Sequence, residues 1–249
     1  MTFLSDLRVL YHLALKPLRG TDHAGRLDSF YAGQAEDYDA FRARLLPGRA
    51  SLLRDVLART PDGGTWVDLG GGTGASLEMA AAELNRLRRV HVVDLSDALL
   101  AVTRRRVRER GWSNVETVRA DATTWRPASG AADAVTLSYA LTMIPDWFRA
   151  VDSAWAMLRP GGVIGVVDFY VSRRHPAAGR TRHGWAPRTL WPIWFGADGV
   201  HVSPDHLPAL EWRFATLGLV EGRTRLPYLP FRAPFYRFVG RKPAAGTRE

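Results

Sequence analysis

Residues 65–75 read TWVDLGGGTGA, and this stretch decides the fold. A short apolar run ends in an acid and a cluster of glycines, and apolar residues at helical spacing follow it. The pattern predicts a strand, a tight turn and a helix. Glycines suit such a turn because it visits positive φ and because a ligand can approach bare backbone. We therefore expect a nucleotide-type ligand at the carboxyl end of a strand in an α/β sheet.

The glycines alone leave the nucleotide open. Gly70, Gly72 and Ala75 fit the loose dinucleotide fingerprint of NAD-dependent oxidoreductases. Gly70, Gly72 and Gly74, preceded by Asp68, fit equally well the loop of class I S-adenosylmethionine (SAM) methyltransferases. Other parts of the chain must decide between the two ligands.

Composition excludes several classes of protein. The 249 residues include no cysteine, which excludes disulfides and thiolate metal sites and fits a reducing compartment. No run of about 18 apolar residues occurs, so no membrane-spanning helix is predicted. Residues 1–6 lack the basic and then apolar start of a secretory signal. We therefore expect a cytoplasmic protein, with one domain over residues 1–249 as the economical interpretation.

The net charge of +9 is concentrated in the last third of the chain. Residues 171–249 hold 13 of the 34 Lys and Arg residues but only 5 of the 25 Asp and Glu residues. A basic face attracts nucleic acid or anionic lipid. A general use of arginine as surface charge explains part of the excess, because Lys16 and Lys242 are the only lysines. The sequence offers no recognised nucleic-acid module, so we expect no nucleic-acid partner.

The first 48 residues predict helices. Residues 3–18 place apolar side chains on one helical face and basic ones on another, so this helix either lies in a membrane interface or packs on the domain. Two short helices are expected near residues 26–34 and 37–45. Tyr38 would contact a cofactor if these helices fold over it, or would otherwise be an ordinary core residue.

From residue 49 onward, strands and helices alternate regularly. Strands are predicted at 65–69, 90–94, 115–118, 134–138, 163–169, 219–226 and 235–241, and helices near 49–59, 75–87, 97–110, 146–158 and 204–217. Ser96 is expected to cap the helix of 97–110, and Gly111 to close it. The fold class is therefore α/β and Rossmann-like: a seven-stranded, mostly parallel sheet with a terminal antiparallel hairpin. Residues 49–170 would form the cofactor-binding core, residues 171–202 a Trp- and Arg-rich insertion after strand five, and residues 203–249 the terminal helix and strands.

Three acids sit at the ends of successive strands, namely Asp68, Asp94 and Asp121. An acid after the second strand can accept hydrogen bonds from both ribose hydroxyls, in either nucleotide family. The acid after the third strand favours SAM, because in class I methyltransferases an acid at that place meets the adenine amine. The predicted cofactor-binding residues are Tyr38, Asp68, Gly70, Gly72, Gly74, Asp94, Leu95, Asp121, Ala122 and Ser138.

More closely, the sequence resembles the N-methyltransferases of betaine-lipid synthesis. The resemblance covers nearly the whole chain and rests on residues 30–39, 66–74, 168–172, 191–195, 198–201 and 236–242. It implies three SAM-dependent methylations that convert diacylglyceryl-homoserine to the trimethylated betaine lipid. It also implies a lipid headgroup substrate, peripheral association with the inner face of the membrane, and contact with the enzyme that makes the homoserine lipid. The alternative acceptors are phosphatidylethanolamine, a quinone and a small amine.

The chemistry of amine methylation suggests where the acceptor binds. A quaternary ammonium product suits an aromatic cage, and a substrate carboxylate suits an arginine. The predicted substrate-binding residues are Tyr139, Tyr170, Arg173, His175 and Trp191. No catalytic base is assigned, because water or a carboxylate can take the proton. No metal is expected, because the histidines lack a tight ligand spacing.

Overall fold

The computed structural model describes residues 46–244 except 129, 197–198 and 226–230. The predicted helices of residues 3–18, 26–34 and 37–45, and Tyr38 with them, lie outside the described residues.

A single seven-stranded sheet runs through the described residues in the order β3-β2-β1-β4-β5-β7-β6. Its strands are β1 (Thr65–Leu69), β2 (Arg89–Asp94), β3 (Val115–Arg119), β4 (Ala132–Ser138), β5 (Leu158–Phe169), β6 (Ala215–Arg225) and β7 (Arg232–Arg241). Strands β1 to β5 pair in parallel, and β7 is antiparallel to both β5 and β6. The predicted α/β, Rossmann-like fold with a terminal antiparallel hairpin is therefore confirmed.

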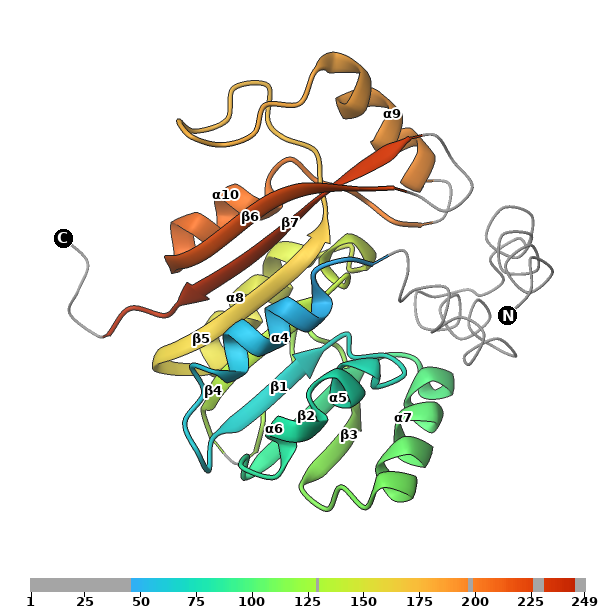
Figure 1. Ribbon diagram of the computed structural model, residues 1–249, viewed down its shortest axis with the longest axis vertical. Coiled ribbons are helices and arrows are strands. Elements are labelled where there is room, and N and C mark those ends of the chain that lie inside the picture. The colour runs from blue at the N-terminus through green and yellow to red at the C-terminus, as the bar shows by residue number, and fades with distance from the viewer. Residues whose placement is uncertain (1–45, 129, 197–198, 226–230, 245–249) are drawn as a thin grey trace.

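Helices cover both faces of this sheet (Figure 1). They are α4 (Arg49–Leu57), α5 (Ala75–Met79), α6 (Ala81–Leu84), α7 (Asp97–Arg110), α8 (Trp147–Met157), α9 (Trp185–Gly196) and α10 (His206–Arg213), with a 3-10 turn η1 (Leu141–Met143). One apolar core contains side chains of α4, α5, α6 and α7, and the other contains side chains of α8 and α10. The central strands β1, β4 and β5 are buried between these two layers, as expected for a mostly parallel sheet.

Helix α7 shows how local sequence sets an element. The Ser96 hydroxyl accepts a hydrogen bond from the Leu99 N–H at 3.3 Å, and Gly111 ends the helix with a φ of 66°. Both features match the prediction. The helix predicted over 75–87 is instead divided at Ala80, whose φ of −106° separates α5 from α6.

The end of the chain departs from the predicted bounds. The helix predicted over 204–217 ends at Arg213, and β6 already begins at Ala215. Most side chains of this edge strand are exposed, so its sequence lacks the alternation that marks a half-buried strand. Pairing with β7 from Ala215 to Arg225 determines its length instead.

Candidate functional site

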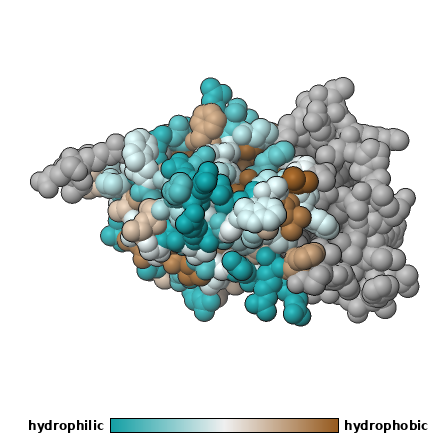
Figure 2. Space-filling model, turned by 90° about the horizontal axis from the view of Figure 1, so that it is seen from above, coloured by the Kyte–Doolittle hydropathy of each residue, from teal (hydrophilic) through white to brown (hydrophobic). Residues whose placement is uncertain are grey.

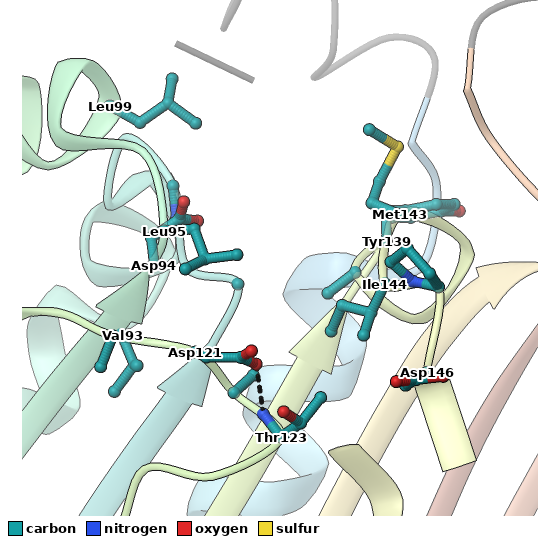
Figure 3. Close-up of a pocket in the computed structure, with 16 residues that line it drawn as sticks. Val93, Asp94, Leu95, Leu99, Asp121, Thr123, Tyr139, Met143, Ile144 and Asp146 are labelled. Atoms are coloured by element: carbon teal, nitrogen blue, oxygen red, sulfur yellow. Dashed lines mark hydrogen bonds between the residues drawn. The ribbon is translucent and has the colours of Figure 1, made fainter. Parts of the chain in front are cut away.

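A cavity of about 250 Å³ opens at the carboxyl ends of β1, β2 and β4. It is lined by Gly70, Gly72, Val93, Asp94, Leu95, Leu99, Ala120, Asp121, Ala122, Thr123, Tyr139, Ala140, Met143, Ile144, Pro145 and Asp146. The strand order reverses between β1 and β4, which is the place where open α/β sheets bind ligands. Figure 3 shows Asp94 and Leu95 on one side, Tyr139 and Met143 on the other, and Asp121 between them.

The glycine turn after β1 forms part of the cavity wall. Gly70 has a φ of 69°, and a Cβ added there would lie 2.7 Å from the Cβ of Ala140. Gly72 also has a positive φ, of 56°. Gly74 does not line the cavity: it caps α5, and a Cβ there would meet the Thr103 side chain at 2.8 Å. The turn therefore leaves bare backbone facing the cavity and packs tightly behind it.

Asp94 connects the end of β2 to the glycine turn. Its carboxylate accepts hydrogen bonds from the N–H groups of Gly72 and Ser96, both at 2.9 Å. Gly72, Asp94 and Leu95 all line the cavity, so Asp94 both fixes the turn and forms part of the cavity wall.

Two further carboxylates line the same cavity. Asp121 follows β3 and accepts a hydrogen bond from the Thr123 N–H at 2.8 Å (Figure 3). Asp146 precedes α8, and its side chain makes no capping hydrogen bond to that helix. With Asp94, three acids surround one cavity, an environment that suits a cationic ligand with hydroxyl and amine donors.

Two of the predicted cofactor residues lie behind the cavity wall. Asp68 is buried, and its carboxylate accepts hydrogen bonds from the hydroxyls of Thr136, at 2.6 Å, and Ser76. Burial raises the pKa of Asp68, while these hydrogen bonds oppose the shift. Ser138 accepts a hydrogen bond from the Arg49 guanidinium at 3.2 Å. Neither residue lines the cavity. Asp68 instead connects β1 to α5 through its hydrogen bond with Ser76.

Residues 67–162, which contain all sixteen residues of this wall, match the family model of a methyltransferase domain. The chain is 33% identical to the ubiquinone/menaquinone biosynthesis C-methyltransferase of Klebsiella pneumoniae over 108 residues. This alignment covers 43% of each of the two chains. It is 33% identical over 150 residues, 58% of each chain, to the demethylmenaquinone methyltransferase of Clavibacter sepedonicus. The chain thus spans about half the length of the curated relatives it matches.

The fold extends beyond the matched residues. The structure of geranyl diphosphate C-methyltransferase from Streptomyces coelicolor superposes with a TM-score of 0.66 at 18% identity, over 91% of this chain and 100% of that one. At this identity the likeness concerns the fold alone. It covers far more of the chain than the family match does.

Tyr139 is the one predicted substrate residue on the wall of the 250 Å³ cavity. It adopts a φ of 53°, and its hydroxyl donates a hydrogen bond to the Pro47 carbonyl at 2.8 Å. Its ring centroid lies 4.9 Å from that of Phe169. Burial raises the pKa of Tyr139 further above its ordinary value, so the hydroxyl stays protonated. Its structure suits positioning rather than proton removal.

The other predicted substrate residues lie elsewhere. Tyr170, Arg173 and His175 line a second, smaller cavity of about 90 Å³. There the Tyr170 hydroxyl bonds to Glu221, and Arg173 forms an ion pair with Asp205 at 2.6 Å. Trp191 is buried in α9, with its ring centroid 5.5 Å from that of Phe195. The structure therefore does not bring the five residues together around one acceptor.

The sequence prediction missed part of the cavity wall. Leu99, Met143, Ile144 and Asp146 line it but carry no recognisable motif. Asp146 had one usable signal: it is an acid directly before the helix that follows the fourth strand.

Among the described residues, no group of three His, Asp or Glu side chains is arranged to hold a metal ion. None of the helices they form is long and apolar enough to cross a bilayer.

Proposed function

We propose that the chain binds SAM in the 250 Å³ cavity and transfers its methyl group to an acceptor that enters beside Tyr139. The observation that carries this proposal is the position of Asp94 and Asp121 at the ends of the adjacent strands β2 and β3, lining the same cavity as Gly70 and Gly72. These carboxylates suit ribose hydroxyls and an adenine amine. Gly70 and Gly72 both have positive φ and line the cavity, so the turn offers bare backbone to such a ligand.

The residues of the chain would act mainly by positioning. Bound SAM would supply an electrophilic methyl group on a cationic sulfur. The three acids around the cavity suit that positive charge, and Tyr139 would hold the acceptor in line with the methyl carbon. Because the hydroxyl of Tyr139 donates its hydrogen bond to the Pro47 carbonyl, the ring of Tyr139 would contact the acceptor.

We infer that the acceptor is a demethylated quinone, methylated on a ring carbon. Both curated relatives are quinone methyltransferases by name, and they support this acceptor. The wall opposite Asp94 is apolar, with Tyr139, Met143 and Ile144, and suits a flat apolar ring. The amine of diacylglyceryl-homoserine is the second candidate. It is favoured by the Trp- and Arg-rich segment of 171–202, which lies outside the family match and carries part of the resemblance to betaine-lipid enzymes.

Both acceptors carry a lipid tail, so the proposal includes association with the inner face of the cytoplasmic membrane. It also includes contact with the enzyme that supplies the acceptor. A pull-down of that enzyme with the purified chain in detergent would test this contact. Failure of the two proteins to co-purify at micromolar concentrations would reject the contact.

Calorimetry tests the cofactor. The purified chain should bind SAM, while NAD should give no heat of binding beyond dilution. NAD binding without SAM binding would overturn the proposal and favour an oxidoreductase.

A separate assay tests the acceptor. The chain would be incubated with SAM labelled on its methyl group and with demethylmenaquinol, diacylglyceryl-homoserine or phosphatidylethanolamine in mixed micelles, with products followed by mass spectrometry. We expect one labelled methyl on the quinol ring. Successive labelling of the homoserine amine, with none on the quinol, would instead establish the betaine-lipid acceptor. Labelling of neither, in a chain that binds SAM, would reject both acceptors.

A further inference from the structure

The outer face of α9 is apolar and exposed. The exposed fraction is 80% for Trp185, 70% for Ile193, 44% for Trp194 and 42% for Leu190. Leu190, Ile193 and Trp194 are three and four residues apart on α9, so they lie on one side of the helix. Trp185 is the exposed first residue of the helix, about two turns before Ile193. Figure 2 looks down on the end of the molecule that carries α9, and apolar residues lie at its surface beside polar ones.

The opposite face of α9 is tied to the 250 Å³ cavity by a row of aromatic rings. Phe195 stacks on Phe169 with centroids 4.8 Å apart, and Phe169 lies 4.9 Å from Tyr139 on the cavity wall. Trp191 extends the row within α9. Figure 1 shows α9 beyond the carboxyl end of β5, at the same end of the sheet as the cavity. A surface on which α9 rests would therefore lie close to the route of the acceptor.

Positive charge surrounds this apolar face. The segment of residues 171–202 contains five arginines and, in its sequence, a single acid, Asp198. Arg174 and Arg182 are exposed in the loop before α9, and Arg188 lies half-buried on α9 itself. Apolar side chains with tryptophan, flanked by arginine, have the composition of a segment that enters the headgroup region of an anionic bilayer.

We propose that the face formed by Trp185, Leu190, Ile193 and Trp194 docks on an anionic lipid bilayer. This inference rests on the proposed function, since a membrane-held acceptor gives the docking a purpose. It goes beyond that function by assigning one helix face as the contact and lipid headgroups as its partner. The uncharged face would lie among the headgroups, and the loop arginines would meet lipid phosphates.

Flotation of the full chain with vesicles tests the proposal. The vesicles would contain phosphatidylcholine alone or phosphatidylcholine with about a quarter phosphatidylglycerol, at low and high salt. The variant would carry Trp185→Ser, Ile193→Ser and Trp194→Ser together. Trp212→Ser is the matched control, because Trp212 is 71% exposed but lies on α10. SAM binding would be measured for every variant, to show that the fold is intact.

We expect the wild-type chain to float with the anionic vesicles, less so at high salt and less with phosphatidylcholine alone. The triple variant should lose at least tenfold in partitioning, and Trp212→Ser should match the wild type. Equal flotation of the triple variant and the wild type would overturn the proposal. So would a wild-type dimer in light scattering that the triple variant converts to a monomer, because a second copy would then cover this face.

A third result would also overturn the proposal: a much larger fall in melting temperature for the triple variant than for Trp212→Ser. The face would then contribute to the stability of the folded chain, which means that it is covered within the chain itself. The outcome is independent of the cofactor. A chain that floats but binds no SAM would keep the docking face and reject the proposed function. A chain that binds SAM but never floats would reject the docking face and keep the proposed cofactor.

Discussion

Asp168 accepts two hydrogen bonds from Thr142, one from its backbone N–H at 3.1 Å and one from its hydroxyl at 2.8 Å. Asp168 lies near the end of β5, and Thr142 lies in η1 beside Met143 of the cavity wall. The Phe169 N–H donates to the same carboxyl group at 2.8 Å. A fully buried carboxyl group thus holds the turn that carries one side of the 250 Å³ cavity.

Replacing Asp168 by Asn should loosen this turn. The amide nitrogen cannot accept a hydrogen bond, so one of the two N–H donors, of Thr142 or Phe169, would be left buried without a partner. We expect a loss of about 1–3 kcal/mol in the free energy of unfolding, and a several-fold weaker affinity for SAM. Urea unfolding and calorimetry measure the two effects. Thr142→Ser keeps both donors and is the control. An Asn variant with unchanged stability and affinity would contradict this role for Asp168.

The same carboxyl group should make stability depend on pH. Burial raises the pKa of Asp168 to about 7, while its hydrogen bonds with Thr142 and Phe169 oppose the shift. The unfolded chain has the ordinary pKa of 3.8, so the folded state binds the proton more tightly between these values. The contribution of Asp168 is complete below about pH 3.8 and is lost as the pH rises to about 7. From pH 5 to pH 7, the free energy of unfolding should therefore fall less for Asp168→Asn than for the wild type. Parallel stability curves would refute this shift.

His206 should give stability the opposite dependence on pH, with a contribution that is lost as the pH falls. Neither ring nitrogen of this buried side chain has a hydrogen-bond partner among the described residues, and its ring packs 4.7 Å from that of Trp147. Burial lowers the pKa of His206 to about 4, from an ordinary value of 6.5. Its contribution is present above pH 6.5 and is lost as the pH falls toward 4.

His206→Leu, which has a similar volume and no polar atoms, should therefore be at least as stable as the wild type at pH 8, and more stable at pH 5. Thermal unfolding at the two pH values measures the difference. A variant that is less stable at pH 5 than at pH 8, by the same margin as the wild type, would show that His206 is not the titrating group.

The sequence was most informative where local chemistry decides the structure. The positive φ values of Gly70 and Gly72, the Ser96 cap and the acids after β2 and β3 all follow from one residue type at one place. These signals predicted the order of the strands along the chain and seven of the sixteen residues that line the cavity, counting Tyr139, which was expected to bind the substrate.

Features that depend on distant packing were predicted less well. Helix α9 was not predicted, because Pro187 and Pro192 argue against a helix. Its formation follows from the packing of Trp191 and Phe195 against Phe169, which lies about two dozen residues earlier. Similarly, Met143 reaches the cavity only because Asp168 holds η1 in place. Neither contact has a signature in the local sequence.

The glycine turn offers a prediction with a matched control. Gly70 and Gly63 have nearly the same φ, 69° and 70°, so an alanine is equally strained at both. A Cβ at Gly70 would lie 2.7 Å from that of Ala140, whereas at Gly63 no atom lies within 4 Å. Gly63→Ala should cost about 1 kcal/mol and leave SAM affinity unchanged. Gly70→Ala should weaken SAM binding at least tenfold. Equal affinities in calorimetry would show that the turn does not contact the cofactor.

Tyr139→Phe separates positioning from proton transfer. The variant keeps the ring contact with Phe169 and loses the hydrogen bond to the Pro47 carbonyl. Since burial raises the pKa of Tyr139, its hydroxyl stays protonated and cannot serve as a base near neutral pH. We expect kcat to fall by less than about tenfold, with an unchanged pH profile, and stability to fall by about 1 kcal/mol. Steady-state kinetics across pH 6 to 9, with the acceptor that the methylation assay identifies, measures this. A loss of about a hundredfold or more in kcat, together with the disappearance of one limb of the pH profile, would instead make Tyr139 the group that takes the proton.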